Sequence, residues 1–255
     1  MKRTSATHSQ YTPHALRAES VLAELKKHAD PIKANILSGF FKTGKGEYGE
    51  GDQFMGITVH VQRKIAQEYK DMELHEVEKL IQNSFHEARL TGLLILVYKV
   101  KNANELMRKA VFDFYMGHTA SVNNWDLVDS TARDIVGGYI FEYTKDRNTL
   151  YKLVRSKQIW ERRIAIIATF YFIARNDFED TVKISKILLS DTHDLIHKAV
   201  GWMLREMGKR DQEVLISFLK KHAHEMPRTM LRYSIERLSP DIRRTYLRAT
   251  SSIIK

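Results

Sequence analysis

The feature that most restricts the fold is a charged residue that recurs near the start of successive helical segments. Arg89, Asp126, Arg163, Lys198 and Arg232 follow one another at separations of 37, 37, 35 and 34 residues. A period of this length is typical of two-helix units, each of which buries its apolar face against the next unit. The sequence therefore predicts an all-α stack of helix pairs. An irregular helical bundle with accidental spacing is the alternative.

Apolar periodicity supports the same fold class. From Thr58 onward, segments of about ten to eighteen residues carry apolar side chains three or four positions apart, and no sustained alternation indicates a sheet. Proline is expected where helices begin, and Asn or Asp where a helix needs an N-cap. The expected starts are Pro31, Pro227 and Pro240, and the expected caps are Asn102, Asn123, Asp194 and Asp211.

We expect residues 1–255 to form a single domain, because a chain of this length buries a sizeable core without a second one. Residues 1–12 are expected to be frayed. Residues 42–56 are expected to form a glycine-rich loop, since five glycines fall between Gly44 and Gly56. A repeat stack needs no partner to complete its core, so a monomer is expected.

The charge of the chain favours a polyanionic partner. Lys and Arg number 41 against 31 Asp and Glu, and residues 201–255 alone hold 12 basic and 6 acidic residues. A basic protein with no such partner remains the alternative.

The absence of cysteine excludes disulfides, thiolate metal ligands and a cysteine nucleophile. It fits a cytoplasmic protein, associated with the nucleoid if its polyanionic partner is DNA. The most apolar run, 164–174, is too short to span a bilayer.

Three tryptophans carry the most specific pattern. Trp125 and Asp129 are four residues apart and share a helical face. Trp160 stands three residues before Arg163, and Trp202 follows in the next expected helix. If the starts of these helices lie along one edge of the stack, the side chains converge. The alternative is core packing, which is common for a tryptophan at a helix start.

These motifs resemble those of the AlkD-type DNA alkylation repair family, over about residues 40–237. The stretches that carry the resemblance are Trp125-Asp126-Leu127-Val128-Asp129, Trp160 with Arg163, Gly201-Trp202-Met203-Leu204-Arg205-Glu206 and, more weakly, Gly56-Ile57-Thr58-Val59-His60-Val61-Gln62-Arg63. The resemblance implies HEAT-like (ARM-type) two-helix repeats in a curved right-handed solenoid with a concave basic groove for duplex DNA. It also implies a monofunctional DNA glycosylase of base excision repair, which hydrolyses the N-glycosidic bond of 3-methyladenine and 7-methylguanine without base flipping.

The resemblance implies that Asp129, Trp125 and Trp202 are catalytic, with Arg163 beside them. An alkylated purine is already cationic, so it leaves without protonation and the enzyme stabilises the sugar instead. A carboxylate such as Asp129 stabilises developing oxocarbenium charge, and indole faces attract positive charge. Arg163 is expected to hold a phosphate and orient Asp129. Its alternative role is an ion pair between repeats.

Basic side chains along the repeats are expected to bind phosphates without reading sequence, although each is equally well explained as a solvated helix charge. The candidates are Arg63, Arg162, Lys198, Arg205 and Arg232. No metal or other cofactor is expected, because His193, His197, His222 and His224 lack the spacing of a zinc hydrolase. A non-catalytic DNA-structure binder and a scaffold for a protein partner are the competing functions.

Overall fold

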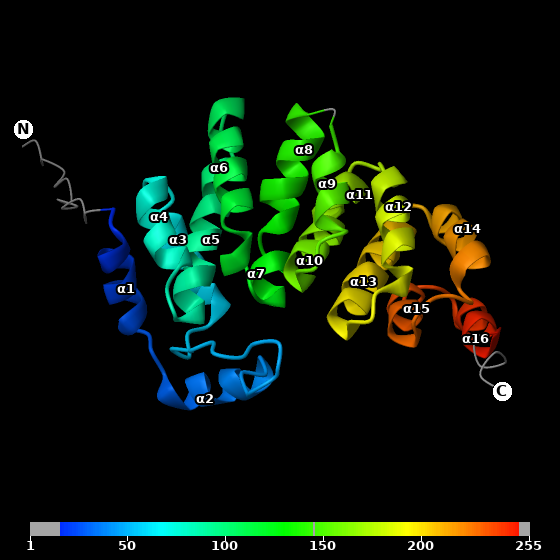
Figure 1. The fold of residues 1–255 in the computed structure, drawn as a ribbon, viewed down its shortest axis with the longest axis horizontal. Helices are drawn as coiled ribbons and strands as arrows, with labels where there is room; N and C mark the ends of the chain where they lie inside the picture. The colour runs from blue at the N-terminus through cyan, green and yellow to red at the C-terminus, as the bar shows by residue number, and fades with distance from the viewer. Residues whose placement is uncertain (1–15, 145, 250–255) are drawn as a thin grey trace, which may run out of the picture. The chain divides into compact units, whose positions relative to one another are not determined.

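The computed structural model describes residues 16–144 and 146–249 (Figure 1). Its described residues form helices α1 to α16 and contain no strand, which confirms the all-α prediction. A single isolated bridge joins Gln53 to Phe85 in this part of the chain. The expected frayed segment, 1–12, lies outside the described residues.

The chain divides into two compact units, residues 1–95 and 96–255, and the boundary falls within helix α5. The described helices of the N-terminal unit are α1 (Ala18–Lys26), α2 (Pro31–Phe40), α3 (Val59–Glu68), α4 (Leu74–Ile81) and most of α5 (His86–Val100). Helices α1, α3 and α4 pack together around buried side chains such as Val21, Leu25 and Leu80. Helix α2 buries none of its residues.

The glycine-rich segment runs without helix from Phe41 to Thr58 and is held at its C-terminal end by charged side chains of α5. The Glu87 carboxylate, 1% exposed, accepts hydrogen bonds from the backbone N–H groups of Met55, Gly56 and Ile57 at 2.8–3.2 Å. Arg89 donates to Asp52 at 2.6 Å. Buried charges therefore anchor this end of the loop, because their removal would leave orphaned backbone donors.

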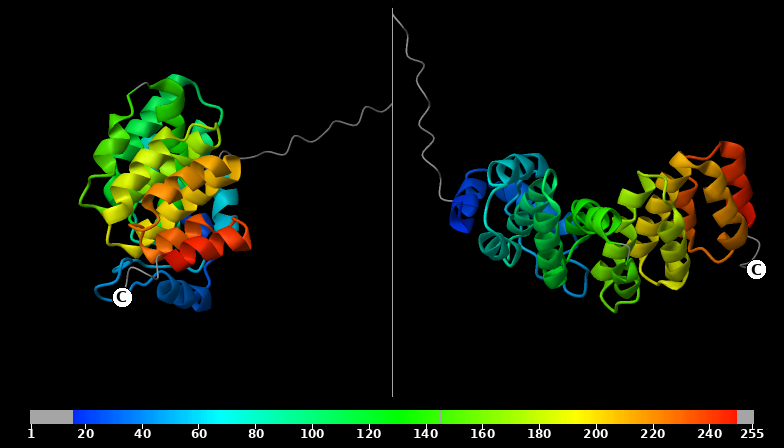
Figure 2. Two further views of the ribbon diagram at one scale, coloured as in Figure 1. Left: turned by 90° about the vertical axis from the view of Figure 1, so that its right-hand side faces the viewer. Right: turned by 90° about the horizontal axis from the view of Figure 1, so that it is seen from above.

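The C-terminal unit is built from helix pairs. Its helices are α6 (Glu105–Gly117), α7 (Trp125–Asp129), α8 (Gly138–Tyr143), α9 (Asn148–Leu153), α10 (Ile159–Ala168), α11 (Phe170–Ile173), α12 (Glu179–Ile187), α13 (Asp194–Arg210), α14 (Gln212–His222), α15 (Arg228–Ser234) and α16 (Pro240–Ala249). Short helical turns η1 (Thr119–Ser121), η2 (Arg133–Gly137) and η3 (Leu188–Ser190) interrupt them. Figure 2, in its left view, looks at the end of this unit, where α14 to α16 face the viewer.

The second helices of successive pairs form a row in which α7, α10, α13 and α15 are neighbours (Figure 1). Hydrogen bonds between neighbouring repeats join residues that are 31 to 34 positions apart in the sequence. Some lie near the helix starts and others lie further along the helices. Neighbours in the row therefore run in the same direction. The five charged residues of the sequence repeat all lie within the first five positions of α5, α7, α10, α13 and α15.

Helix boundaries follow the expected residue types with small shifts in position. Pro31 and Pro240 are the first residues of α2 and α16, and Pro227 precedes α15. Asp211 caps α14, as expected. The caps of α6, α7 and α13 are Asn104, Asn124 and His193, so the expected Asn102, Asn123 and Asp194 were one or two residues away. Polar residues that lie next to one another in the sequence are equally good candidates for an N-cap. The backbone path at the helix start decides which of them caps the helix.

Glycine allows close packing between α13 and α15. A Cβ atom on Gly201 would lie 2.5 Å from the Cβ atom of Tyr233 and 2.6 Å from the carbonyl oxygen of Met230. Both distances are shorter than van der Waals contact, so any larger residue forces the two helices apart.

We expect Gly201→Ala to lower the free energy of unfolding by about 1–3 kcal/mol through overpacking, although alanine is the better helix former. Chemical denaturation monitored by circular dichroism measures the change. Gly117→Ala is the matched control, because no atom lies within 4 Å of its added Cβ, and it should raise stability by about 0.5 kcal/mol. Equal effects of the two substitutions would contradict the close approach.

Candidate active site

Helix α7 is short, and hydrogen bonds from buried polar side chains hold it in place. Asn124, fully buried, caps it and accepts from the backbone N–H of Trp125 at 2.8 Å. Thr131, just after the helix, donates to the carbonyl of Leu127 at 2.6 Å and hydrogen-bonds to the buried Tyr115 hydroxyl at 3.0 Å. These bonds fix the helix that carries both Trp125 and Asp129.

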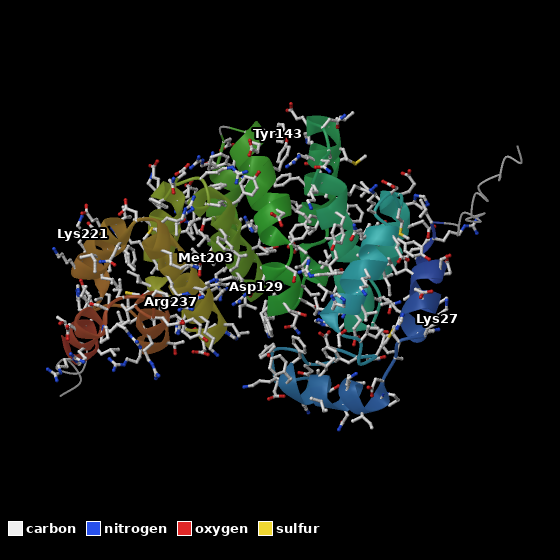
Figure 3. All side chains as sticks on the ribbon, turned by 180° about the vertical axis from the view of Figure 1, so that it is seen from behind. Lys27, Asp129, Tyr143, Met203, Lys221 and Arg237 are labelled. Atoms are coloured by element: carbon white, nitrogen blue, oxygen red, sulfur yellow. The ribbon has the colours of Figure 1, made fainter. Side chains whose placement is uncertain are left out.

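Asp129, the last residue of α7, forms a bidentate ion pair with Arg163 of α10. Arg163 Nε donates to Oδ1 at 2.8 Å and Nη2 donates to Oδ2 at 2.7 Å, while Nη1 donates to the carbonyl oxygen of Leu195 at the start of α13. The Arg163 side chain is 5% exposed and that of Asp129 is 17% exposed. The guanidinium therefore joins three successive helices of the row, and the Asp129 carboxylate remains partly exposed to solvent. Figure 3 labels Asp129.

The surroundings of Asp129 act on its proton affinity in opposite directions. Burial raises the pKa of the Asp129 carboxyl above its ordinary value, and the charge and hydrogen bonds of Arg163 oppose this rise. The pKa of Tyr115 is raised by its burial and by the nearby Asp129 charge. The Tyr115 hydroxyl thus stays neutral, and Asp129 and Arg163 are the charged groups of this cluster.

The three tryptophans differ in their places. Trp125 and Trp160 are the first and second residues of α7 and α10, and Trp160 is buried. Trp202 was expected near a helix start but is the ninth residue of α13, because that helix already begins at Asp194. Trp202 is seven residues beyond Leu195, about 10 Å further along the helix, and its ring lies edge-on to that of Phe170, with 5.7 Å between centroids.

Arg133 is a candidate that the sequence analysis missed. It begins the π-helical turn η2, four residues after Asp129, and its guanidinium carbon lies 4.8 Å from the ring centroid of Phe170. The same ring contacts Trp202. The Arg133 guanidinium and the Trp202 indole thus both contact the Phe170 ring, which links η2, α11 and α13. No local pattern marks Phe170 as the link, because its partners are 37 and 32 residues away.

The five expected phosphate-binding residues have different surroundings. Arg162 is bound to Asp191 at 2.6 Å and to the carbonyls of Ser156 and Lys157, so it ties two loops together. Lys198 pairs with Asp194 at 2.7 Å, and Arg205 pairs with Glu206 and Glu236. Arg63 on α3 and Arg232 on α15 are exposed and form no ion pair with another described residue.

The histidines and the apolar helices show no metal or membrane feature. His193 accepts from the backbone N–H of Leu195 as the cap of α13. Among residues 16–144 and 146–249, no group of three or more His, Cys, Asp or Glu side chains is placed to hold a metal ion. No helix in the same ranges has the length and apolarity needed to cross a membrane.

The row of parallel helices and the carboxylate–guanidinium pair at its edge define an all-α helical-repeat protein with a partly buried acidic site. The sequence profile described as "DNA alkylation repair enzyme" matches residues 21–238. The chain therefore belongs to the DNA alkylation repair enzyme family. No curated protein matches the sequence.

Two solved structures are similar in fold. One is a predicted DNA alkylation repair enzyme from Enterococcus faecalis, 16% identical, with a TM-score of 0.65 over 84% of this chain and 98% of that chain. The other is AlkD2 from Streptococcus mutans, 15% identical, with a TM-score of 0.47 over 92% of this chain and 97% of that chain. The first similarity supports the helical-repeat fold.

Proposed function

We propose that this protein is a monofunctional DNA glycosylase that hydrolyses the N-glycosidic bond of cationic alkylated purines, 3-methyladenine and 7-methylguanine, in duplex DNA. The observation that carries the proposal is the partly exposed Asp129 carboxylate, fixed by both donors of the Arg163 fork. The proposed enzyme acts as a monomer.

Asp129 supplies the electrostatic part of the mechanism. An alkylated purine carries a positive charge and leaves as a neutral base, so the bond breaks without a general acid. As it breaks, the deoxyribose gains oxocarbenium character, which a fixed carboxylate stabilises more than it stabilises the uncharged sugar of the ground state. Because the carboxylate is already held in place, it need not reorganise during the reaction. Water then adds to the sugar carbon while Asp129 orients it, and the proton that the water loses passes to solvent.

Arg163 acts as a positioning residue in this mechanism. Its three nitrogen groups are bound to Asp129 and to Leu195, and its side chain is buried, so it holds the carboxylate rather than a phosphate. Trp125, on the same short helix as Asp129, forms a wall against the sugar. Trp202 and Arg133, joined through Phe170, are proposed to contact the DNA further along the row.

The direct test is the release of free 7-methylguanine and 3-methyladenine from dimethyl-sulfate-treated duplex DNA by the purified protein. We expect release that depends on enzyme concentration and leaves abasic sites without strand cleavage. Unmethylated duplex of the same sequence is the control. No release of either base at protein concentrations that saturate the DNA would contradict the proposal.

A second function is favoured by one specific observation. Both oxygens of Asp129 are bound by Arg163, an arrangement that also serves as a strut between consecutive repeats. If this is its only role, the protein is a non-catalytic DNA-structure binder. Such a protein would bind duplex or branched DNA with strong salt dependence and would release no base. The base-release assay, run beside a binding assay, separates the two functions.

The pH dependence of excision follows from the direction of the Asp129 pKa. The ionised carboxylate is the active form, and its pKa is raised by burial, so the rate should fall as pH drops through that raised value. We expect a single acid limb, centred above the ordinary range for an aspartate, with a plateau toward neutral pH. Single-turnover release of 7-methylguanine between pH about 4 and about 8 measures it.

Acid itself depurinates methylated DNA, so samples without enzyme are subtracted at each pH. Binding to undamaged duplex is measured over the same range to separate affinity from chemistry. A rate that rises toward acid would instead indicate a general acid and would remove Asp129 from the proposed role.

A further inference from the structure

A cavity of about 470 Å³ lies between α15 and α16, beyond the site described above. Three arginines, Arg228, Arg232 and Arg243, line it, together with Tyr233, Glu236 and Leu247. The family profile ends at residue 238, whereas α16 begins at Pro240. One wall of this cavity is therefore contributed by a segment outside the matched region.

The charge of the cavity is positive because its one acidic residue is engaged elsewhere. Glu236 is bound by Arg205 of α13 through Oε2, and its Oε1 lies 3.8 Å from Arg237 Nε. Arg228 donates to the carbonyl oxygen of Leu247 at 2.9 Å, which ties the start of α15 to the end of α16. The cavity is thus held in shape by contacts that leave its positive charge in excess.

Two of the arginines have hydrogen-bond donors that no described residue accepts from. The Nε of Arg243 is buried and has no hydrogen-bond partner among the described residues. Arg232 is exposed and forms no ion pair with any of them. An anion in the cavity would offset the excess positive charge of the lining arginines and accept hydrogen bonds from their guanidinium groups. A phosphate group, with several acceptor oxygens, matches the geometry of forked guanidinium donors and can accept from more than one of them.

We propose that this cavity binds a backbone phosphate of duplex DNA, as an anchor outside the lesion site. The assignment to DNA rests on the proposed function and on position. Helix α15 follows α13 in the row that carries Asp129 and Trp202, and the Arg205–Glu236 ion pair links the cavity to α13. Tyr233, 37% exposed, offers a surface for the neighbouring sugar.

The test compares Arg232→Gln/Arg243→Gln with Lys220→Gln/Lys221→Gln. Both variants remove two positive charges, but the lysines are exposed on α14, away from the cavity (Lys221 is labelled in Figure 3). Affinity for an undamaged duplex is measured over a salt series. We expect the arginine variant to bind roughly tenfold more weakly at moderate salt and to lower the slope of log K against log salt by about 1. The lysine variant should leave the slope unchanged.

Equal losses in the two variants, or no loss in either, would overturn the proposal. A second arm titrates inorganic phosphate at constant ionic strength. Phosphate binding that the arginine variant loses, with an unchanged DNA slope, would assign the cavity to a free phosphate and also overturn it. Thermal denaturation verifies that both variants fold. Because the duplex is undamaged, a slope change without base release would support the anchor and contradict only the glycosylase proposal.

Discussion

Asp129→Asn is expected to lower single-turnover excision of 7-methylguanine by about 10²–10³-fold, the usual cost of removing one preorganised electrostatic contact to a transition state. The substitution keeps the size and shape of the side chain and removes the charge. Binding to undamaged duplex should change by less than about twofold, since the carboxylate acts on charge that develops only as the bond breaks.

Asp126→Asn is the matched control, because Asp126 lies on the same helix and its carboxylate accepts from the backbone N–H of Leu127 at 2.9 Å. We expect its excision rate to stay close to that of the wild type. If Asp129→Asn released base as fast as the wild type, the protein would remain a glycosylase but Asp129 would have no part in the chemistry.

Arg163→Met is expected to have the largest effect on stability. It removes both donors to Asp129 and the bond to Leu195, and it leaves a largely buried carboxylate without a counter-charge. Loss of one partner of a buried ion pair costs about 3 kcal/mol. Denaturant unfolding should show this loss, whereas Arg155→Met, at an exposed arginine of the same unit, should change stability by less than about 0.5 kcal/mol.

Two further measurements distinguish a positioning residue from a simple strut. In Arg163→Met the pKa of Asp129 should rise further, so the acid limb of the excision profile should move to higher pH. The double variant Asp129→Asn/Arg163→Met should recover part of the lost stability, because no unpaired charge remains. An acid limb at the wild-type pH in a folded Arg163→Met protein would limit Arg163 to a structural role.

The part of the fold that follows a strict period was predictable. The repeat of charged residues correctly placed the starts of α5, α7, α10, α13 and α15, because each helix pair must meet its neighbour in the same register. The contact between Asp129 and Arg163 corresponds to the alternative role considered for Arg163, an ion pair between repeats. Their separation of 34 residues equals about one repeat, so two residues at equivalent places become neighbours.

The helix break, the position of Trp202 and the long-range side-chain partners were not predictable, because they depend on packing between helices. The apolar run 164–174 is divided at Thr169 between α10 and α11. Trp202 lies about two turns beyond the start of α13, although a position near a helix start was expected. Arg162 pairs with Asp191, a partner 29 residues away that no local motif identifies. The stack of Arg133 on Phe170 likewise exists only once the row has assembled.

The π-helical turn η2 affects the alignment of the Asp129–Arg163 ion pair. A π turn accommodates one residue more than a regular helix over the same span, so η2 has the form of a single-residue insertion between Asp129 and α8. Each residue turns a helix by about 100°. Deletion of one residue from Arg133–Gly137 would therefore rotate the preceding turn and carry Asp129 away from Arg163. The alignment of this ion pair thus depends on chain length at one point as much as on residue identity.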